Sequence, residues 1–172
     1  MSNQRRIDRR GFLAAGALAA AGLTAPAIAE SRTAGRRLEG KRVLIATGES
    51  GEALETYYMI FRLREEGAIP VVGSRTVKRL QLVVHDFEPA YEGYTEKPGY
   101  QVDVDVAYKS ADPASFGGLL IPGGRAPEEI RLDKDLVKIV GHFLDKKLPV
   151  GAMCHGVMLI YTARPIKGRK MT

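Results

Sequence analysis

Between Leu148 and Ile160 the chain reads Leu-Pro-Val-Gly-Ala-Met-Cys-His-Gly-Val-Met-Leu-Ile: a short apolar segment of strand type, a Cys-His-Gly turn, and an apolar segment of helical type. Cys154 is the only cysteine in the 172 residues. Small residues stand two positions before it (Ala152) and two after it (Gly156). This spacing matches the nucleophile elbow, a turn so tight that larger neighbours would clash. It predicts a cysteine side chain that projects above a sheet.

The setting of Cys154 leaves two interpretations open. A helix N-terminus beneath the sulfur, together with a protonated His155, would favour the thiolate, the reactive form of cysteine. The alternative is a buried structural cysteine, which is the usual role of a lone cysteine. A single cysteine excludes an intramolecular disulfide even in an oxidising compartment.

The first 29 residues have the organisation of an export signal. Four arginines between positions 5 and 10 precede a run rich in Ala, Gly and Leu that ends at Ala27-Ile28-Ala29. This order predicts a signal peptide over residues 1–29 with cleavage after Ala29, and the run is too short and too rich in Ala and Gly to favour a membrane span. Asp8-Arg9-Arg10-Gly11-Phe12-Leu13 resembles a twin-arginine signal. We expect an exported protein, periplasmic or extracellular, that meets the membrane only through this signal. A general secretory signal is the alternative.

Composition narrows the remaining chain to one small domain. Residues 1–29 carry four Arg and one Asp of the net charge of +6, which leaves +3 for the rest. This charge is too low to indicate nucleic-acid binding. We expect a flexible segment over residues 30–40 and one domain over residues 41–172. The chain has no Cys/His cluster with metal-ligand spacing, so we predict neither a metal nor another cofactor.

Apolar strands alternate with helices along this domain. Strands are predicted at 41–46, 69–72, 119–121 and 148–153. A helix that Gly67 ends follows the first strand, and a second spans 135–146 with Leu136, Ile139, Val140, Phe143 and Leu144 on one side. The expected apolar face of the first helix consists of Leu54, Tyr57, Tyr58 and Phe61. Fully apolar strands in such an order predict an α/β fold with a mostly parallel sheet covered on both faces.

The pattern of apolar and polar residues changes in the segment between the second and third of these strands. Apolar residues alternate with polar ones around Leu82 and again around Val104, as in half-exposed strands. The stretch between them, Glu88–Gly99, has the composition of a long loop. A β-hairpin at the rim of the site, a subunit contact and a decorative insertion remain open. His85 lies in this segment as a weak candidate for substrate or metal contact, and His142 is expected to be exposed.

A glycine pair follows the strand at 119–121. Ligands collect outside the carboxyl ends of strands in α/β sheets. A backbone N–H of Gly123 or Gly124, with that of His155, could form an oxyanion hole. The alternative is an ordinary Gly-Gly turn. The spacing does not fit a phosphate-binding loop of a nucleotide site.

Three motifs together strongly resemble the PfpI (intracellular protease I) family, in the superfamily of the parkinsonism-associated deglycase: Gly48–Thr56, Ile121–Glu128 and Met153–Gly156. The resemblance covers about residues 41–172. It implies a flavodoxin-like (class I glutamine amidotransferase-like) three-layer sandwich that works as a dimer or larger homo-oligomer. It also implies that the late strands and closing helix are missing, so that the domain is C-terminally truncated.

The resemblance assigns roles to four residues. Cys154 would be the nucleophile and His155 its base or imidazolium partner. Glu128 matches the acid that reaches the histidine of a neighbouring subunit, and Glu55 matches the carboxyl group that hydrogen-bonds the cysteine sulfur. From the residues alone, a solvated helix carboxylate is the favoured interpretation of Glu55, and Glu128 is equally a residue that offsets a helix dipole.

The expected function is therefore that of an exported, cysteine-dependent hydrolase or lyase. Its substrates would be peptides or small carbonyl or amide compounds, as in protease, glyoxalase or deglycase chemistry. The alternatives are a redox, stress-response or chaperone-like protein that uses Cys154 as an oxidisable thiol, and an inactive truncated remnant. Class I amidotransferases share the elbow but need a His and a Glu from a later region, so His155 favours the PfpI interpretation.

Overall fold

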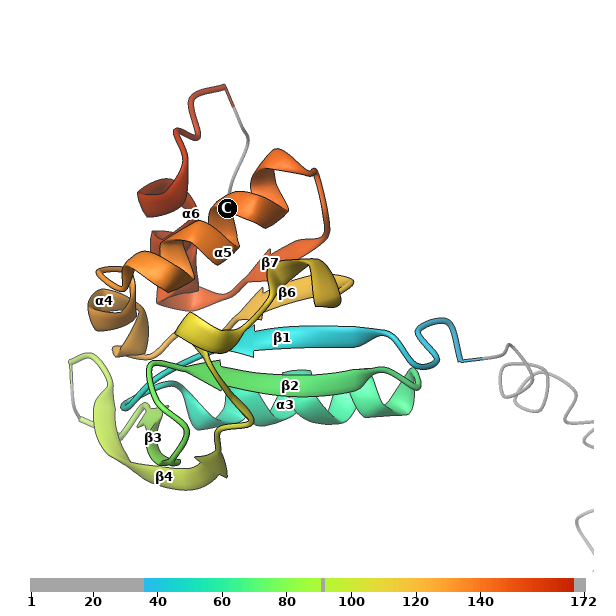
Figure 1. Cartoon of the computed structure of the whole chain (residues 1–172). Coiled ribbons are helices and arrows are strands. Elements are labelled where there is room, and N and C mark those ends of the chain that lie inside the picture. Colours follow the sequence, from blue (N-terminus) through green and yellow to red (C-terminus); the bar gives the residue numbers. More distant parts are fainter. Residues whose placement is uncertain (1–35, 91, 169–172) are drawn as a thin grey trace, which may run out of the picture. The chain divides into compact units, whose positions relative to one another are not determined.

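A five-stranded parallel sheet forms the centre of the domain (Figure 1). The structure is a computed structural model that describes residues 36–90 and 92–168. The strand order is β5-β2-β1-β6-β7. The strands are β1 (Arg42–Ala46), β2 (Ile69–Ser74), β5 (Val106–Ala107), β6 (Gly118–Ile121) and β7 (Val150–Ala152). The predicted α/β class with a mostly parallel sheet is confirmed.

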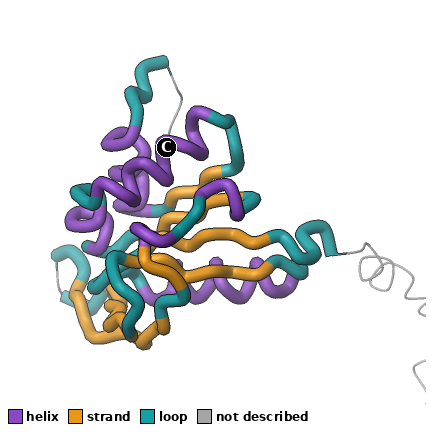
Figure 2. Tube along the Cα trace, viewed as in Figure 1, coloured by secondary structure: helices purple, strands orange, loops and turns teal. Residues whose placement is uncertain are grey.

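Helices cover both faces of this sheet, which gives three layers (Figures 1 and 2). Along β1, Leu44 and Ala46 belong to a core shared with α5 and α6, whereas Val43 and Ile45 belong to a core shared with α3. Successive side chains of a strand point to opposite faces, so one strand supplies both cores. The helices are α3 (Ala53–Glu65), α4 (Ala126–Ile130), α5 (Lys134–Asp145) and α6 (Val157–Ala163), with 3-10 turns at Tyr108–Ser110, Pro113–Ser115 and Cys154–Gly156.

The predicted apolar face of α3 is wrong. Leu54, Tyr58 and Phe61 are 61%, 62% and 55% exposed. The helix instead buries a face that begins with two small residues, which allow close approach to the sheet: Ala53, Thr56, Met59, Ile60 and Leu63. Because apolar residues occur almost all around α3, their spacing could not identify the face that packs. The helix ends at Glu65, just before Gly67 with its positive φ of 82°, as predicted.

Helix α5 follows its sequence pattern closely. Leu136, Ile139, Val140 and Phe143 are all buried against the sheet, as predicted. Asp133 caps the helix by accepting hydrogen bonds from two N–H groups of the first turn. His142 is half-buried rather than exposed, and its ring contacts that of Phe143 with 5.8 Å between centroids.

The segment between β2 and β5 forms a separate two-stranded antiparallel sheet. Its strands are β3 (Arg79–Asp86) and β4 (Thr95–Asp103). Leu80, Leu82 and Val102 pack into the same core as α3. Strand β4 begins at Thr95, so the predicted loop from Glu88 to Gly99 is shorter than expected. The hairpin interpretation is confirmed for this segment.

The chain enters the domain through a turn at residues 36–40, part of the segment predicted to be flexible. Its backbone donates hydrogen bonds from Leu38 to Glu66 and from Gly40 to Gly67, at 3.1 and 3.0 Å. The predicted signal peptide, its cleavage site and residues 30–35 lie outside the described residues. Among the helices described, none combines the length and the apolar character needed to cross a bilayer.

Candidate active site

Cys154 lies at a strained turn between β7 and α6. Strand β7 ends at Ala152, and α6 begins at Val157 after a single 3-10 turn. The backbone of Cys154 has φ +52°, a region that residues other than glycine adopt rarely and at a cost of about 1–3 kcal/mol. Its side chain is exposed. The turn therefore has the geometry that the sequence predicted for the elbow.

Two glycines make this turn sterically possible. A Cβ atom on Gly156 would lie 2.2 Å from the carbonyl oxygen of Ile121 at the end of β6. A Cβ atom on Gly123 would lie 2.4 Å from Cβ and 2.9 Å from Sγ of Cys154. The elbow thus packs directly on the β6 end, with no room for side chains between them.

Glu55, in the first turn of α3, reaches the same place. Its Oε2 accepts a hydrogen bond from the Gly123 N–H at 2.5 Å. A Cβ on Gly123 would lie 3.0 Å from this oxygen and 2.9 Å from the cysteine Sγ, so both atoms border one small space. Burial raises the pKa of Glu55 and the nearby Glu52 adds to this, while the Gly123 hydrogen bond opposes it. A raised pKa favours the protonated carboxyl, which can donate a hydrogen bond.

The hydrogen bond to Glu55 bears on the predicted oxyanion hole. Because the Gly123 N–H already donates to a carboxylate oxygen, it is not free for a substrate oxygen. The N–H groups of Gly124 and His155 then remain as the candidates that the sequence named. Their role stays a prediction.

His155 and Glu128 meet at the other side of the elbow. Nδ1 of His155 lies 3.3 Å from Oε1 of Glu128, which comes from the first turn of α4. Nδ1 is shielded from solvent and does not complete a hydrogen bond in this geometry. The contact forms within one chain, whereas the family resemblance implied a contact with a neighbouring subunit's histidine.

A charged chain of residues that the sequence analysis did not assemble lies beside the elbow. His85 Nδ1 is 2.7 Å from Glu52 Oε2, and its Nε2 is 3.0 Å from Glu96 Oε2. Glu96 also accepts two hydrogen bonds from the Arg125 guanidinium, at 2.8 and 2.6 Å. Chiefly this guanidinium, with His85, lowers the pKa of Glu96 to about 2. These contacts bind the hairpin to the start of α3 and to the glycine loop, residues 122–125 between β6 and α4.

One sequence signal could have identified Glu52. It stands at the N-cap of α3, where Ser, Thr, Asp and Asn are preferred, and its Oε1 accepts from the Leu54 N–H. Glu52 is also only 6% exposed, although buried carboxylates are rare without partners. A glutamate at a cap position predicts that its longer side chain also binds another group, here the ring of His85. Within residues 36–90 and 92–168, no group of His, Cys, Asp or Glu side chains is placed to hold a metal ion.

These residues surround a cavity of about 340 Å³ that opens at Cys154. It brings together the elbow, the start of α3, the glycine loop and the hairpin. Its lining consists of Glu52, Leu54, Glu55, His85, Phe87, Tyr94, Gly124, Arg125, Cys154 and His155. Four predicted site residues, Glu55, Gly124, Cys154 and His155, therefore share one cavity. The other two, Gly123 and Glu128, do not line it, although Glu128 contacts His155.

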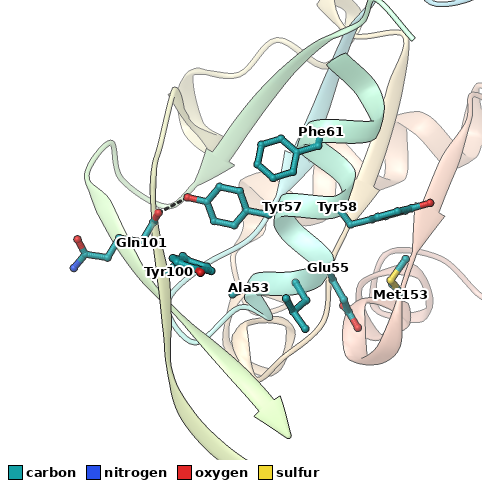
Figure 3. Close-up of a pocket in the computed structure, with 9 residues that line it drawn as sticks. Ala53, Glu55, Tyr57, Tyr58, Phe61, Tyr100, Gln101 and Met153 are labelled. Carbon is teal, nitrogen blue, oxygen red and sulfur yellow. Dashed lines mark hydrogen bonds between the residues drawn. The ribbon is translucent and has the colours of Figure 1, made fainter. Parts of the chain in front are cut away.

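A second cavity of about 850 Å³ adjoins the first (Figure 3). It lies over the exposed face of α3, where Tyr57, Tyr58 and Phe61 project, with Tyr100 of β4 opposite and Met153 of the elbow beside them. Leu54 and Glu55 line both cavities. Glu55 therefore lies at the boundary between the site around Cys154 and a mostly apolar groove.

Comparison with known proteins places this arrangement in a family. The model of the DJ-1/PfpI family matches residues 41–172. An uncharacterized protein of Archaeoglobus fulgidus is 39% identical and the deglycase TK1284 of Thermococcus kodakarensis is 36% identical, each over 131 residues. Both matches cover 76% of this chain and 70% of the relative.

A solved structure shares the fold. It is a two-domain protein from Anabaena variabilis with a DJ-1/ThiJ/PfpI-like and a ferritin-like domain. The match has a TM-score of 0.63 at 22% sequence identity and covers 76% of this chain and 34% of that one. At this identity it supports the flavodoxin-like fold alone. With the family match over residues 41–172 and relatives above 30% identity, the chain belongs to the DJ-1/PfpI family.

Proposed function

We propose that this chain is a cysteine-dependent enzyme of deglycase or glyoxalase type that acts on small carbonyl compounds. The observation that carries the proposal is the exposed Cys154 at a strained elbow, opening into a cavity that also holds His155 and Glu55. A volume of about 340 Å³ is at the small end of ligand pockets and suits a small molecule better than a peptide. The relative from Thermococcus kodakarensis is named a deglycase.

The first chemical step is addition of the thiol to the carbonyl carbon. The sulfur of Cys154 forms a bond to carbon while its proton passes to His155, and the C=O π electrons move to oxygen. The developing oxyanion accepts hydrogen bonds from the Gly124 and His155 N–H groups. Proton return to that oxygen completes a hemithioacetal, so atoms and charges balance without a further reagent.

The remaining carboxyl groups assist this step. Burial favours the protonated form of Glu55, which can donate a hydrogen bond to the sulfur or to the substrate oxygen. Glu128, 3.3 Å from Nδ1 of His155, stabilises the imidazolium that forms when the ring takes the thiol proton.

Turnover by Cys154→Ser tests the proposal. Wild type and variant are compared on methylglyoxal and on a peptide substrate, with circular dichroism confirming that both are folded. We expect wild-type turnover of methylglyoxal above that of the peptide, and a loss of about a thousandfold or more in the variant. Equal activity of the two proteins on methylglyoxal would refute a cysteine nucleophile.

An oxidisable thiol is the second candidate, because the sulfur is exposed and no other cysteine exists to form a disulfide with it. In that case Cys154 would react with peroxide to a sulfenic acid, trapped by dimedone, while both substrates remain unconverted. Turnover that depends on Cys154 distinguishes the enzyme from this sensor.

The proposal includes export by the twin-arginine pathway, supported by the arginine-rich start and the Ala27-Ile28-Ala29 sequence. Expression in a bacterium with this pathway, followed by intact-mass analysis of the periplasmic fraction, should give a chain that starts at Glu30. Retention of the full-length chain in the cytoplasm would contradict it.

A further inference from the structure

Three large apolar side chains stand exposed around the cysteine, and the mechanism above uses none of them. Phe87 is 79%, Leu54 61% and Tyr94 53% exposed, and all three line the cavity at Cys154. Phe87 and Tyr94 belong to the hairpin. Single exposed apolar residues are common, but a group that borders a reactive side chain indicates a surface for an apolar ligand group.

The charged residues of the hairpin hold one of these rings, that of Tyr94, in place. The His85 ring lies edge-on to Tyr94 with 4.8 Å between centroids. Both of its nitrogens face carboxylate oxygens, at 2.7 Å for Glu52 and 3.0 Å for Glu96. His85 thus joins the hairpin to the start of α3 through contacts with two carboxyl groups.

The side chains of Glu52, His85, Glu96 and Arg125 also limit the electrostatic attraction between the cavity and a charged ligand. The carboxyl groups of Glu52 and Glu96 already contact His85, and Glu96 also pairs with Arg125. An anionic substrate would therefore gain little from Arg125, whose guanidinium already makes two hydrogen bonds to Glu96. Selection at this end of the cavity falls to the apolar side chains.

We propose that the β3–β4 hairpin is the specificity element of the Cys154 site. Leu54, Phe87 and Tyr94 form an apolar wall that favours carbonyl compounds with an aromatic or branched apolar group next to the reacting carbon. His85 is a positioning residue that fixes Tyr94 in this wall. The choice of carbonyl compounds rests on the proposed function, whereas the preference for apolar groups at Cys154 does not.

Alkylation of Cys154 tests the wall without any turnover. Iodoacetamide and its N-phenyl derivative carry the same reacting carbon, and the single cysteine makes the intact mass report one site. The ratio of the phenyl rate to the parent rate in the folded chain is compared with that in the urea-unfolded chain. We expect a ratio about three- to tenfold higher in the folded chain, the effect of one or two aromatic contacts.

Variants assign this preference to the hairpin. Phe87→Ala and Tyr94→Ala should each lower the ratio toward the unfolded value, while His142→Ala on the distant helix α5 should leave it unchanged. Phe87 is the more exposed of the two, so its variant keeps the test valid if Tyr94→Ala fails to fold. An equal ratio in folded and unfolded wild type, or one that neither variant lowers, would overturn the proposal.

His85 is tested by a substitution pair. His85→Ala should lower the ratio as much as Tyr94→Ala, and His85→Gln should restore part of it because an amide can still donate to one carboxylate. A role in stability alone would lower the melting temperature and leave the ratio unchanged. If turnover is found, the ratio of KM values for phenylglyoxal and methylglyoxal should shift with kcat nearly constant. Loss of activity in Cys154→Ser with no shift in these ratios would retain the function and reject the wall.

Discussion

The parallel sheet and the antiparallel hairpin contribute to one cavity by different physical means. The sheet places Cys154 by steric exclusion, with Gly123 and Gly156 in contact with backbone and side-chain atoms that leave no alternative position. The hairpin, which carries Phe87 and Tyr94, is held at a partly exposed surface by the Glu96–Arg125 ion pair and by the contacts of His85. Steric positioning tolerates almost no substitution, whereas positioning by ion pairs can be changed residue by residue. We infer that reactivity resides in the sheet and selectivity in the hairpin.

The largest effect is expected for Gly156→Ala, which tests the steric positioning of Cys154. The added Cβ would lie 2.2 Å from the carbonyl oxygen of Ile121, so the elbow or β6 must move. We expect a loss of about 3 kcal/mol in the free energy of unfolding, measured in urea. Gly117→Ala is the control, because its Cβ would meet nothing closer than 3.8 Å. Equal stability of the two variants would contradict the steric account.

Gly123→Ala tests the position of Cys154 rather than the stability of the fold. Its Cβ would lie 2.4 Å from Cβ of Cys154 and would displace the cysteine from Glu55. Misplacement by about 1 Å costs on the order of a hundredfold in rate, so methylglyoxal turnover should fall by that factor. Gly118→Ala, with contacts no closer than 3.7 Å, should keep most of the activity. Similar turnover in both variants would show that the elbow tolerates displacement.

The sequence predicted the parallel sheet, the elbow and helix α5 well. Apolar strands, the elbow spacing and the capped helix α5 are local patterns, and each has one favourable structure. The pattern failed on α3, where Leu54, Tyr58 and Phe61 looked like a core face but are exposed. Only the neighbouring elements decide which side of an apolar helix packs, and these are distant in sequence.

The charged chain could not be predicted for a related reason. His85, Glu96 and Arg125 lie on three segments that the fold brings together. Arg125 stands in the Ile121–Glu128 motif, but its partner Glu96 and the neighbouring His85 belong to no local motif with fixed spacing. The carboxyl groups Glu55 and Glu128 were named through the family resemblance, not through their own sequence setting. Long-range ion pairs leave little trace in one sequence, whereas steric turns require small residues at fixed positions.

Glu55→Gln tests how far the stability around Cys154 depends on a protonated carboxyl group at position 55. Burial raises the folded-state pKa of Glu55 above its ordinary 4.5, so wild-type stability declines as pH rises through that raised value. The variant has no charge to bury. It should match wild type at pH 4 and be more stable by about 1 kcal/mol at pH 7.5, in urea unfolding at both pH values. A stability difference independent of pH would contradict the proposed protonation.

Glu96→Gln gives the opposite pH dependence in the hairpin. Arg125 and His85 lower the pKa of Glu96 to about 2, so its contribution is present above pH 4.5 and is lost as pH falls through about 2. We expect the variant to be less stable by about 1 kcal/mol at pH 7, a small effect because the pair is partly exposed. The difference should disappear between pH 4.5 and 2. Glu92→Gln, at an exposed glutamate of the loop that precedes β4, should change neither the stability at pH 7 nor its pH dependence.

Protection of Cys154 by substrate tests the central claim most directly. The alkylation rate of the single cysteine by iodoacetamide is measured with and without saturating methylglyoxal, at a pH where turnover is observed. If the sulfur adds to the carbonyl, alkylation should slow in proportion to occupancy and recover when the carbonyl compound is consumed. Undiminished alkylation during turnover would show that the chemistry proceeds without Cys154 and would contradict the account.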